Sequence, residues 1–286
     1  MPHVSTDGID TYYEVHGEGP ATPLVLSHGL GATSQQWVPH LLPLAETRPL
    51  ILYDTRGHGK TTAPPGDQQY SLEIFAADLA GMLNAMGVKK AHVGGQSLGG
   101  MITANLAVDF PALCASATLS DTSCGNGVDE GEAGKWERWV QSVIGNRASI
   151  VEEHGLEEAM RREYNFRKEN DPGFRDSPYT LDDYVRRART TPAAGYAAAA
   201  RAIVERPDLT ARLGSITVPT LVMVGERDWL APCAWRDHSL IKGSRFVLRR
   251  NCGHGFRWRV DTFVAELEAF LADVDAGRRT AGKREV

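Results

Sequence analysis

The sequence lacks the features that mark membrane, metal-binding and nucleic-acid-binding proteins. No run approaches the ~18 apolar residues of a membrane helix, and no basic segment followed by an apolar run marks a signal peptide. The nine histidines show no metal-ligand spacing such as His-x-x-x-His. The net charge of −5 does not indicate the positively charged surface that nucleic-acid-binding proteins have. We interpret the arginine runs at 161–162 and 186–189 as solvated helix faces. We therefore expect no membrane contact, no nucleic acid and no metal.

Cysteine is also scarce, and its spacing excludes a disulfide framework. The four cysteines are Cys114, Cys124, Cys233 and Cys252, with no C-x-x-C pair. Widely spaced cysteines suit free thiols in a reducing compartment, so the expected location is the cytoplasm. The 286 residues have an ordinary globular composition, 42% hydrophobic and 23% charged. A chain of this length forms one large domain, with or without an insertion.

Short β-rich runs alternate with helical segments over the first 120 residues. The clearest helix has apolar residues at i, i+3, i+4 and i+7 from Leu72 to Met86, with Ser71 as N-cap and Gly87 as its stop. Strands that are apolar throughout and alternate with helices predict a mostly parallel sheet with helices on both faces. The expected strands are residues 11–15, 23–27, 50–53, 91–94, 115–119, 220–224 and 246–248.

Strand character is missing between residues 121 and 215, where three or four helical segments occur instead. A helical block inserted between two strands of one sheet is most simply a cap over the functional site. We therefore expect residues 1–120 and 216–274 to form the core and residues 121–215 to form a helical cap. The polar and basic residues 275–286 are predicted to be disordered.

One serine lies where an α/β sheet would place a nucleophile. The segment Gly95-Gln96-Ser97-Leu98-Gly99 follows a predicted strand and precedes a predicted helix. Such a turn strains the dihedral angles of the serine, and glycines two residues before and after it leave room. The hydroxyl also lies beside the N–H donors and positive dipole end of the helix. We predict that Ser97 is a nucleophile; an incidental serine in a glycine-rich turn is the alternative.

A serine nucleophile needs a base, because its unperturbed hydroxyl is a poor nucleophile. In this arrangement the acid and the histidine follow the serine in that order, each after a later strand. Asp228 and His254 both follow predicted strands in that order. We predict that Asp228 orients His254 and that His254 takes the proton of Ser97. Asp121 and Glu226 remain open as alternatives for the acid.

Two backbone amides are expected to bind the oxyanion of the reaction. Leu30, in a glycine-rich turn after a strand, supplies one N–H and Leu98 supplies the other. His28 is expected to hold this turn rather than to act in catalysis. Trp37, just after the turn, is the best candidate for an apolar substrate pocket. Further candidates, which equally well pack cap against core, are Trp136, Trp139, Trp229 and Trp258.

These residues together resemble the α/β-hydrolase superfamily, and within it the 3-oxoadipate enol-lactonase-like group of lactonases and esterases. The resemblance runs from Tyr12 to about Leu271. It implies an α/β-hydrolase fold with a mostly parallel eight-stranded sheet and an inserted helical cap. The segments that carry it are Ser27-His28-Gly29-Leu30-Gly31, Asp54-Thr55-Arg56-Gly57-His58-Gly59, the serine turn and Gly225-Glu226-Arg227-Asp228-Trp229-Leu230-Ala231-Pro232.

Two departures from that group lie where the substrate is expected. After the histidine the group has a short acidic-proline stretch, whereas this chain has the arginine-rich residues 255–261. The predicted cap is also long and charge-rich between Trp136 and Arg189. These departures put the enol-lactone itself in doubt as the natural substrate.

The predicted reaction is hydrolysis of a carboxylic ester or lactone through an acyl-enzyme on Ser97, without metal or organic cofactor. The predicted partner is a small-molecule substrate, and a homodimer is compatible with the sequence. Carbon–carbon bond hydrolysis and perhydrolysis are alternatives that use the same three side chains. A lactone-sensing receptor on a hydrolase scaffold is the non-enzymatic alternative.

Overall fold

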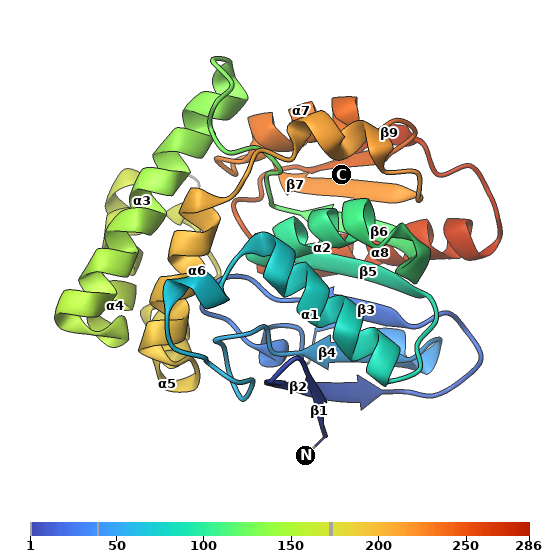
Figure 1. Cartoon of the computed structure of the whole chain (residues 1–286). Coiled ribbons are helices and arrows are strands. Elements are labelled where there is room, and N and C mark those ends of the chain that lie inside the picture. The colour runs from blue at the N-terminus through green and yellow to red at the C-terminus, as the bar shows by residue number, and fades with distance from the viewer. Residues whose placement is uncertain (1, 39, 172–173) are drawn as a thin grey trace.

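A nine-stranded, mostly parallel sheet forms the centre of the molecule (Figure 1). The structure is a computed structural model that describes residues 2–38, 40–171 and 174–286. The strand order is β1-β2-β4-β3-β5-β6-β7-β8-β9. Only the β1–β2 and β2–β4 pairs are antiparallel among the described strands. The strands are β1 (His3–Thr6), β2 (Ile9–His16), β3 (Leu24–Ser27), β4 (Leu50–Tyr53), β5 (Ala91–Gln96), β6 (Cys114–Ser120), β7 (Thr220–Gly225), β8 (Arg245–Arg249) and β9 (Gly282–Glu285).

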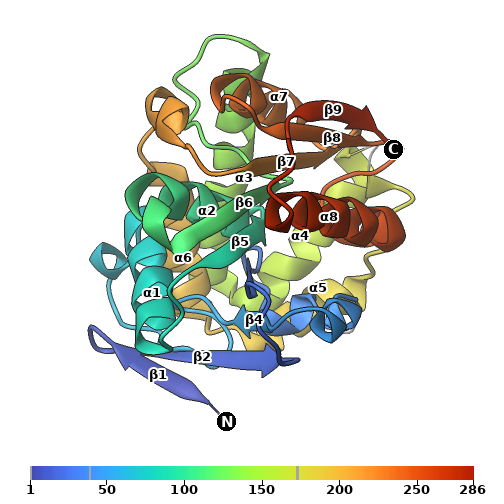
Figure 2. The ribbon, with the colours of Figure 1, turned by 90° about the vertical axis from the view of Figure 1, so that its right-hand side faces the viewer.

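The central strands are apolar along their whole length because helices cover both faces of the sheet. Every residue of β3, β4 and β7 is buried. Alternate side chains enter two cores: Leu24 and Leu26 pack with α8, whereas Val25 packs with α1 and α2. Figure 2 shows α8 on one side of the sheet and α1 and α2 on the other. The helices are α1 (Leu72–Ala85), α2 (Leu98–Asp109), α7 (Ala231–Leu240) and α8 (Val260–Asp275).

The predicted start of α1 is confirmed. Ser71 has extended backbone, and its hydroxyl accepts a hydrogen bond of 3.1 Å from the Ile74 N–H. This contact satisfies one of the amide donors that the first turn of a helix leaves without an internal partner.

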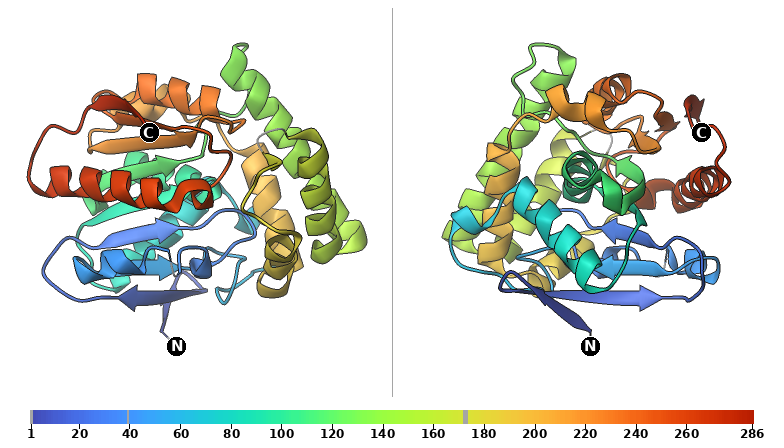
Figure 3. Two further views of the ribbon diagram at one scale, coloured as in Figure 1. Left: turned by 180° about the vertical axis from the view of Figure 1, so that it is seen from behind. Right: turned by 45° about the vertical axis from the view of Figure 1, so that its right-hand side comes forward.

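Among the described residues, four α-helices lie between β6 and β7 in the chain, in the region that lacked strand character. They gather at one end of the sheet, beyond the end of α8 (Figure 3). The third of them, α5 (Leu181–Thr190), begins with a capping box, in which the side chains of Thr180 and Asp183 each bond to the backbone of the other residue. The four helices are α3 (Glu132–His154), α4 (Leu156–Asn170), α5 (Leu181–Thr190) and α6 (Ala193–Glu205).

The sheet has one strand more than the eight expected, because part of residues 275–286 is ordered rather than disordered. Residues 282–285 form β9, which pairs in parallel with β8. The backbone of Val286 extends the pairing, with its N–H donating to Leu248 at 3.0 Å. All four residues of β9 are exposed. An edge strand that buries no side chain needs no apolar alternation, so its composition alone does not reveal it.

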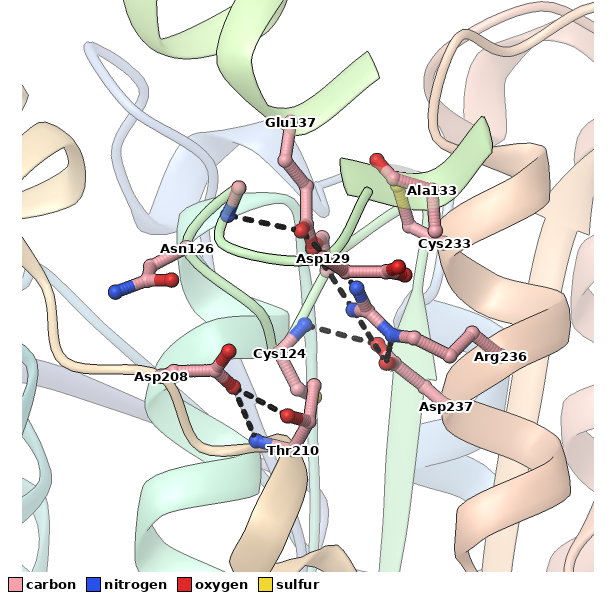
Figure 4. Close-up of polar contacts among 12 residues, drawn as sticks. Cys124, Asn126, Asp129, Ala133, Glu137, Asp208, Thr210, Cys233, Arg236 and Asp237 are labelled. Carbon is pink, nitrogen blue, oxygen red and sulfur yellow. Dashed lines mark hydrogen bonds and ion pairs between the residues drawn. The ribbon is translucent and has the colours of Figure 1, made fainter. Parts of the chain in front are cut away.

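A buried ionic network joins the start of α3 to α7 (Figure 4). The Glu137 side chain on α3 is only 1% exposed and accepts from both terminal nitrogens of Arg236, at 3.0 and 2.8 Å. Asp237 also contacts Arg236 and accepts from the Cys124 N–H at 2.8 Å. Burial raises the pKa of a carboxyl, but Arg236 holds the pKa of Glu137 below its usual value. We call Glu137, Arg236 and Asp237 the α3–α7 anchor.

The four cysteines are free and buried. None of the helices in the described part of the chain has the length and apolar character needed to cross a membrane. Within the same residues no group of three or more His, Cys, Asp or Glu side chains is arranged to hold a metal ion.

Candidate active site

Ser97 lies in the strained turn between β5 and α2. Its φ of 58° and ψ of −117° are unusual for a residue with a side chain. The flanking glycines are required by close approach of backbone: a Cβ at Gly99 would lie 2.0 Å from the Ser27 carbonyl oxygen. A Cβ at Gly95 would lie 2.2 Å from the Gly99 carbonyl carbon. The structure therefore places Ser97 in the strand–turn–helix geometry that the sequence predicts.

His254 and Asp228 form a hydrogen-bonded pair on the loops that follow β8 and β7. His254 Nδ1 lies 2.8 Å from Asp228 Oδ2. The other carboxylate oxygen of Asp228 accepts from the Leu230 N–H at 3.0 Å, which fixes its orientation. His254 and Ser97 line the same cavity. The structure thus brings the three predicted side chains to one end of the sheet.

The pair also sets the charge of both groups. Burial alone would lower the pKa of His254, but the carboxylate of Asp228 raises it above the usual value. Burial alone would raise the pKa of Asp228, but the interaction with His254 holds it below its usual value. Asp228 is therefore an anion at neutral pH that favours a positive charge on the imidazole.

The two alternative acids have other partners. Asp121 is fully buried and accepts from Arg249 Nη2 with both oxygens, at 3.0 and 2.9 Å. Burial raises the pKa of Asp121, opposed by Arg249. Glu226 is partly exposed and pairs with Arg250 at 2.6 Å. Among the described contacts, neither carboxylate makes a hydrogen bond to His254.

The backbone amides of Leu30 and Leu98, predicted to bind the oxyanion, come from two different segments of the chain. Leu98 is the first residue of α2, directly after Ser97, and Leu30 lines the same cavity as Ser97. Neither N–H donates a hydrogen bond to another of the residues that the structure describes. By contrast, the neighbouring Gly29 N–H donates to Gln36 Oε1 at 3.1 Å. Two N–H groups near Ser97 are therefore left for an external acceptor.

His28 holds the turn that carries Leu30, as expected. It is fully buried, its Nε2 accepts from the Thr55 N–H at 3.0 Å, and its Nδ1 lies 2.8 Å from the Gly29 oxygen. Burial lowers the pKa of His28 to about 4, so the ring is neutral near pH 7. A neutral imidazole with both nitrogens engaged has no proton to exchange with a substrate.

A cavity of about 480 Å³ opens beside Ser97, but only one of the predicted tryptophans lines it. Trp229 is that residue. The prediction for Trp37 is wrong: its side chain is 0% exposed and stacks on Phe256 at 4.9 Å in the core beneath α8. Trp139 lies behind Trp229, with ring centroids 4.3 Å apart, and contacts Trp136 at 5.8 Å. Trp136 and Trp139 support the wall of the cavity rather than forming its surface.

The sequence interpretation missed the arginines of the cavity wall. Arg187 and Arg186 of α5 line the cavity, although the run at 186–189 was expected to be a solvated face. Of the three arginines in this run, Arg186 and Arg189 are exposed, whereas Arg187 is partly buried. One sequence feature could have indicated a positively charged cavity. It is the arginine-rich segment after His254, from which Arg257 also lines the cavity. The rotation of α5 about its own axis determines which of its arginines face the cavity. This rotation depends on packing between segments that are distant in the sequence.

The fold and this geometry define an α/β hydrolase, and comparison with known sequences agrees. The family model described as alpha/beta hydrolase fold matches residues 22–258, so the chain belongs to this family. The resemblance predicted from the sequence is confirmed at this level. Family and relatives together support a hydrolase activity.

Several individual proteins are similar to three quarters or more of the chain. The chain is 28% identical to 3-oxoadipate enol-lactonase 1 of Acinetobacter baylyi, over 75% of this chain and 74% of that protein. It is 28% identical to the proline iminopeptidase of Lactobacillus crispatus, over 94% of this chain and 96% of that protein. A thermophilic esterase from Thermogutta terrifontis has a TM-score of 0.80 and 26% identity, over 96% of this chain and 100% of that chain. The names of these proteins refer to the hydrolysis of different bonds, so family membership alone does not identify the substrate of this chain.

Proposed function

We propose that the protein hydrolyses a carboxylic ester or lactone through an acyl-enzyme on Ser97. The observation that carries the proposal is the 2.8 Å hydrogen bond between His254 Nδ1 and Asp228, beside the cavity that Ser97 lines. The enol-lactonase and the esterase among the similar proteins support this class of bond.

Acylation begins when the Ser97 oxygen attacks the carbonyl carbon and its proton moves to Nε2 of His254. The carbonyl oxygen becomes an anion and accepts hydrogen bonds from the Leu30 and Leu98 amides. Each such donor contributes about 3 kcal/mol of transition-state stabilisation. The carbon–oxygen bond to the leaving group then breaks, and His254 gives its proton to the departing alkoxide.

Deacylation repeats these steps with water as the nucleophile. His254 takes a proton from water, the hydroxide oxygen bonds to the acyl carbon, and the Ser97 oxygen leaves with the proton from His254. The net change is one ester and one water converted to an acid and an alcohol. A lactone gives both groups in one hydroxy acid.

Asp228 is the positioning partner of His254 in this scheme. Its carboxylate holds the ring with Nε2 toward Ser97 and stabilises the imidazolium that forms in each half-reaction. The Leu230 amide fixes the carboxylate in turn. The pairing of Asp121 with Arg249 leaves Asp228 as the acid that we assign.

We also propose that residues 121–215 act as the cap that selects the substrate. Their helices face Leu30, Ser97 and His254 across the cavity. The wall residues that α3, α4 and α5 contribute include Val140, Ile144, Glu163 and Tyr184.

A fluorophosphonate probe, which reacts with activated serines, tests the nucleophile directly. We expect one adduct per chain, located on the peptide that contains Ser97, and no adduct on Ser97→Ala.

The substrate class then follows from kcat/KM on p-nitrophenyl esters, γ-lactones, acyl-homoserine lactones and macrolactones, with a vinylogous diketone as the carbon–carbon control. The proposal fails if Ser97→Ala keeps full turnover or if only the diketone is cleaved. Slow single turnover with ligand-induced thermal stabilisation would instead indicate a receptor.

A further inference from the structure

The wall of the cavity carries more positive than negative side chains. Two carboxylates, Glu163 and Asp183, line it. The arginines that line it are Arg147, Arg167, Arg186, Arg187 and Arg257. Burying positive charge beside an active site is costly unless anions compensate for it, so each guanidinium needs an identified partner.

Four of these arginines have a carboxylate partner within the protein. These contacts explain why they lie at the cavity without implying any ligand. The pairs are Arg147 with Glu163 at 3.0 Å, Arg167 with Asp171 at 3.2 Å, Arg186 with Asp182, and Arg257 with Asp183 at 3.2 Å.

Arg187 differs from the other four. It is partly buried on α5 and lines the cavity. Its backbone carbonyl accepts hydrogen bonds from Thr190 and Thr191, but its guanidinium makes no ion pair or hydrogen bond with another residue that the structure describes. Its guanidinium carbon lies 4.6 Å from the ring centroid of Tyr184, a cation–π contact that orients the group but leaves its charge uncompensated. The positive charge of Arg187 also opposes the rise that burial causes in the pKa of Tyr179, which lines the same cavity.

Two deeper arginines, Arg147 and Arg167, are paired with carboxylates, but each still leaves one side-chain N–H group unused. The Nε atoms of Arg147 and Arg167 are buried and have no hydrogen-bond partner among the described residues. Arg167 also stacks over Trp229, at 4.7 Å from the ring centroid, close to the loop of Asp228. Positive groups that line a cleft with apolar walls attract anions and raise their local concentration.

We propose that the natural substrate carries a carboxylate in addition to its ester or lactone carbonyl, and that Arg187 binds this carboxylate. The planar guanidinium presents paired N–H donors that match the two oxygens of a carboxylate. The inference rests on the proposed hydrolase function and specifies its substrate class. Arg187 is then a specificity-determining residue, while Ser97, His254 and Asp228 carry out the chemistry.

Matched pairs of substrates test the inference. The first compares p-nitrophenyl monoesters of adipate, pimelate and suberate with p-nitrophenyl hexanoate, heptanoate and octanoate, so that chain length is equal and only the terminal carboxylate differs. The second places the carboxylate on the alcohol side, comparing 6-(butyryloxy)hexanoate with hexyl butyrate in a pH-stat. We expect kcat/KM to favour the charged member of at least one pair by about 10- to 100-fold.

Arg187→Gln and Arg189→Gln separate a specific contact from general electrostatics. Both lie on α5 and remove one positive charge, but Arg189 is exposed and does not line the cavity. Arg187→Gln should lose the preference for the charged ester and change kcat/KM on the neutral ester by less than about threefold. Arg189→Gln should keep the preference, and Arg187→Lys should keep part of it, because a single ammonium binds a carboxylate less specifically.

Competition by free adipate and suberate gives a readout besides turnover. We expect them to inhibit hydrolysis of the neutral ester, with an inhibition constant about 10-fold weaker in Arg187→Gln. The inference is overturned if none of the four substrate pairs shows a charge preference, or if Arg187→Gln and Arg189→Gln behave alike. That result differs from failure of the proposed function, in which neither neutral nor charged esters are cleaved and Ser97 is not labelled.

Discussion

The described part of the chain contains two Ser–His–Asp arrangements, and the one with the more complete hydrogen bonding is not the candidate active site. His92 on β5 lies 2.8 Å from the Ser116 hydroxyl and 2.9 Å from Asp275 Oδ1. At the candidate site, by contrast, the described contacts include a bond between His254 and Asp228 but none to Ser97. Continuous hydrogen bonding therefore does not distinguish a catalytic arrangement.

Access and backbone geometry do distinguish them. Ser116 is 0% exposed within β6, and His92 is 1% exposed. Neither lines the cavity, so no carbonyl reaches the Ser116 oxygen. Ser97 instead lies in a strained turn at the cavity, next to the Leu98 amide, which has no partner among the described residues. The missing bond to Ser97 agrees with the looser contacts that catalytic groups show before substrate binds.

The buried arrangement has a structural role that its position explains. It joins β5 and β6 to Asp275, the last residue of α8. Arg48 also contacts Asp275, at 2.8 Å. A cluster that holds a helix end to a sheet contributes to the free energy of unfolding and not to turnover. Substitutions in the two arrangements should therefore have opposite consequences.

The largest difference is expected from removing each serine. Ser97→Ala should lower kcat on a p-nitrophenyl ester by roughly 10⁴- to 10⁶-fold, because the acyl-enzyme no longer forms. Ser116→Ala should change kcat by less than about twofold, because its hydroxyl contacts no substrate. Circular dichroism of both variants checks that the fold is kept. Equal losses in the two folded variants would contradict the distinction.

Removing each aspartate should give the next largest difference. Asp228→Asn is expected to lower kcat by about 10⁴-fold, since the amide favours the wrong tautomer of His254 and does not stabilise its cation. Asp275→Asn should leave kcat within about twofold. Steady-state kinetics on one ester measures both. If Asp228→Asn retained wild-type kcat, Asp121 would have to be reconsidered as the acid.

The pH dependence of the wild-type enzyme should report His254 and not His92. The base must be neutral, and Asp228 raises the pKa of His254, so kcat/KM should fall as the pH drops through a value above 6.5. Below that value the loss should be about tenfold per pH unit. Asp228→Asn should move this limb to lower pH, whereas Asp275→Asn should leave it in place. If kcat/KM of the wild type fell only below pH 6, this result would argue against the hydrogen-bonded pair of His254 and Asp228.

The smallest difference is expected in thermal stability. Here Ser116→Ala should have the larger effect and Ser97→Ala the smaller one, the reverse of their effects on kcat. Ser116→Ala removes the buried hydroxyl that bonds His92, which costs about 1 kcal/mol and lowers Tm by roughly 2–4 °C. Ser97→Ala should change Tm by less, because the Ser97 hydroxyl faces the cavity and not a buried partner. Differential scanning calorimetry compares the two. A lower Tm for Ser97→Ala than for Ser116→Ala would reverse this assignment of roles.

The parts of the site that the sequence predicts are those determined by short segments. The turn around Ser97 is visible in five residues, because steric limits require glycine at 95 and 99. The positions of Asp228 and His254 follow from strand order, since the carboxyl ends of parallel strands meet at one edge. These features need no knowledge of how helices pack on the sheet.

The features that escaped prediction depend on packing between distant segments. Trp37 follows the oxyanion turn in sequence but enters the core with Phe256 and Phe263. Arg187 faces the cavity because of the rotation of α5, which a charge-rich sequence does not reveal. β9 is held by backbone pairing with β8, and side-chain composition carries no trace of it.

The α3–α7 anchor has a consequence for how this enzyme can acquire new substrates. α7 begins three residues after Asp228, so Glu137 and Arg236 tie the insertion to the same segment that orients His254. The side chains of α5 that face the cavity lie outside this network. Mutational libraries on α5 therefore explore specificity while the reacting groups keep their spacing. Libraries on the first turns of α3 would disturb both at once, and few of their members would remain active.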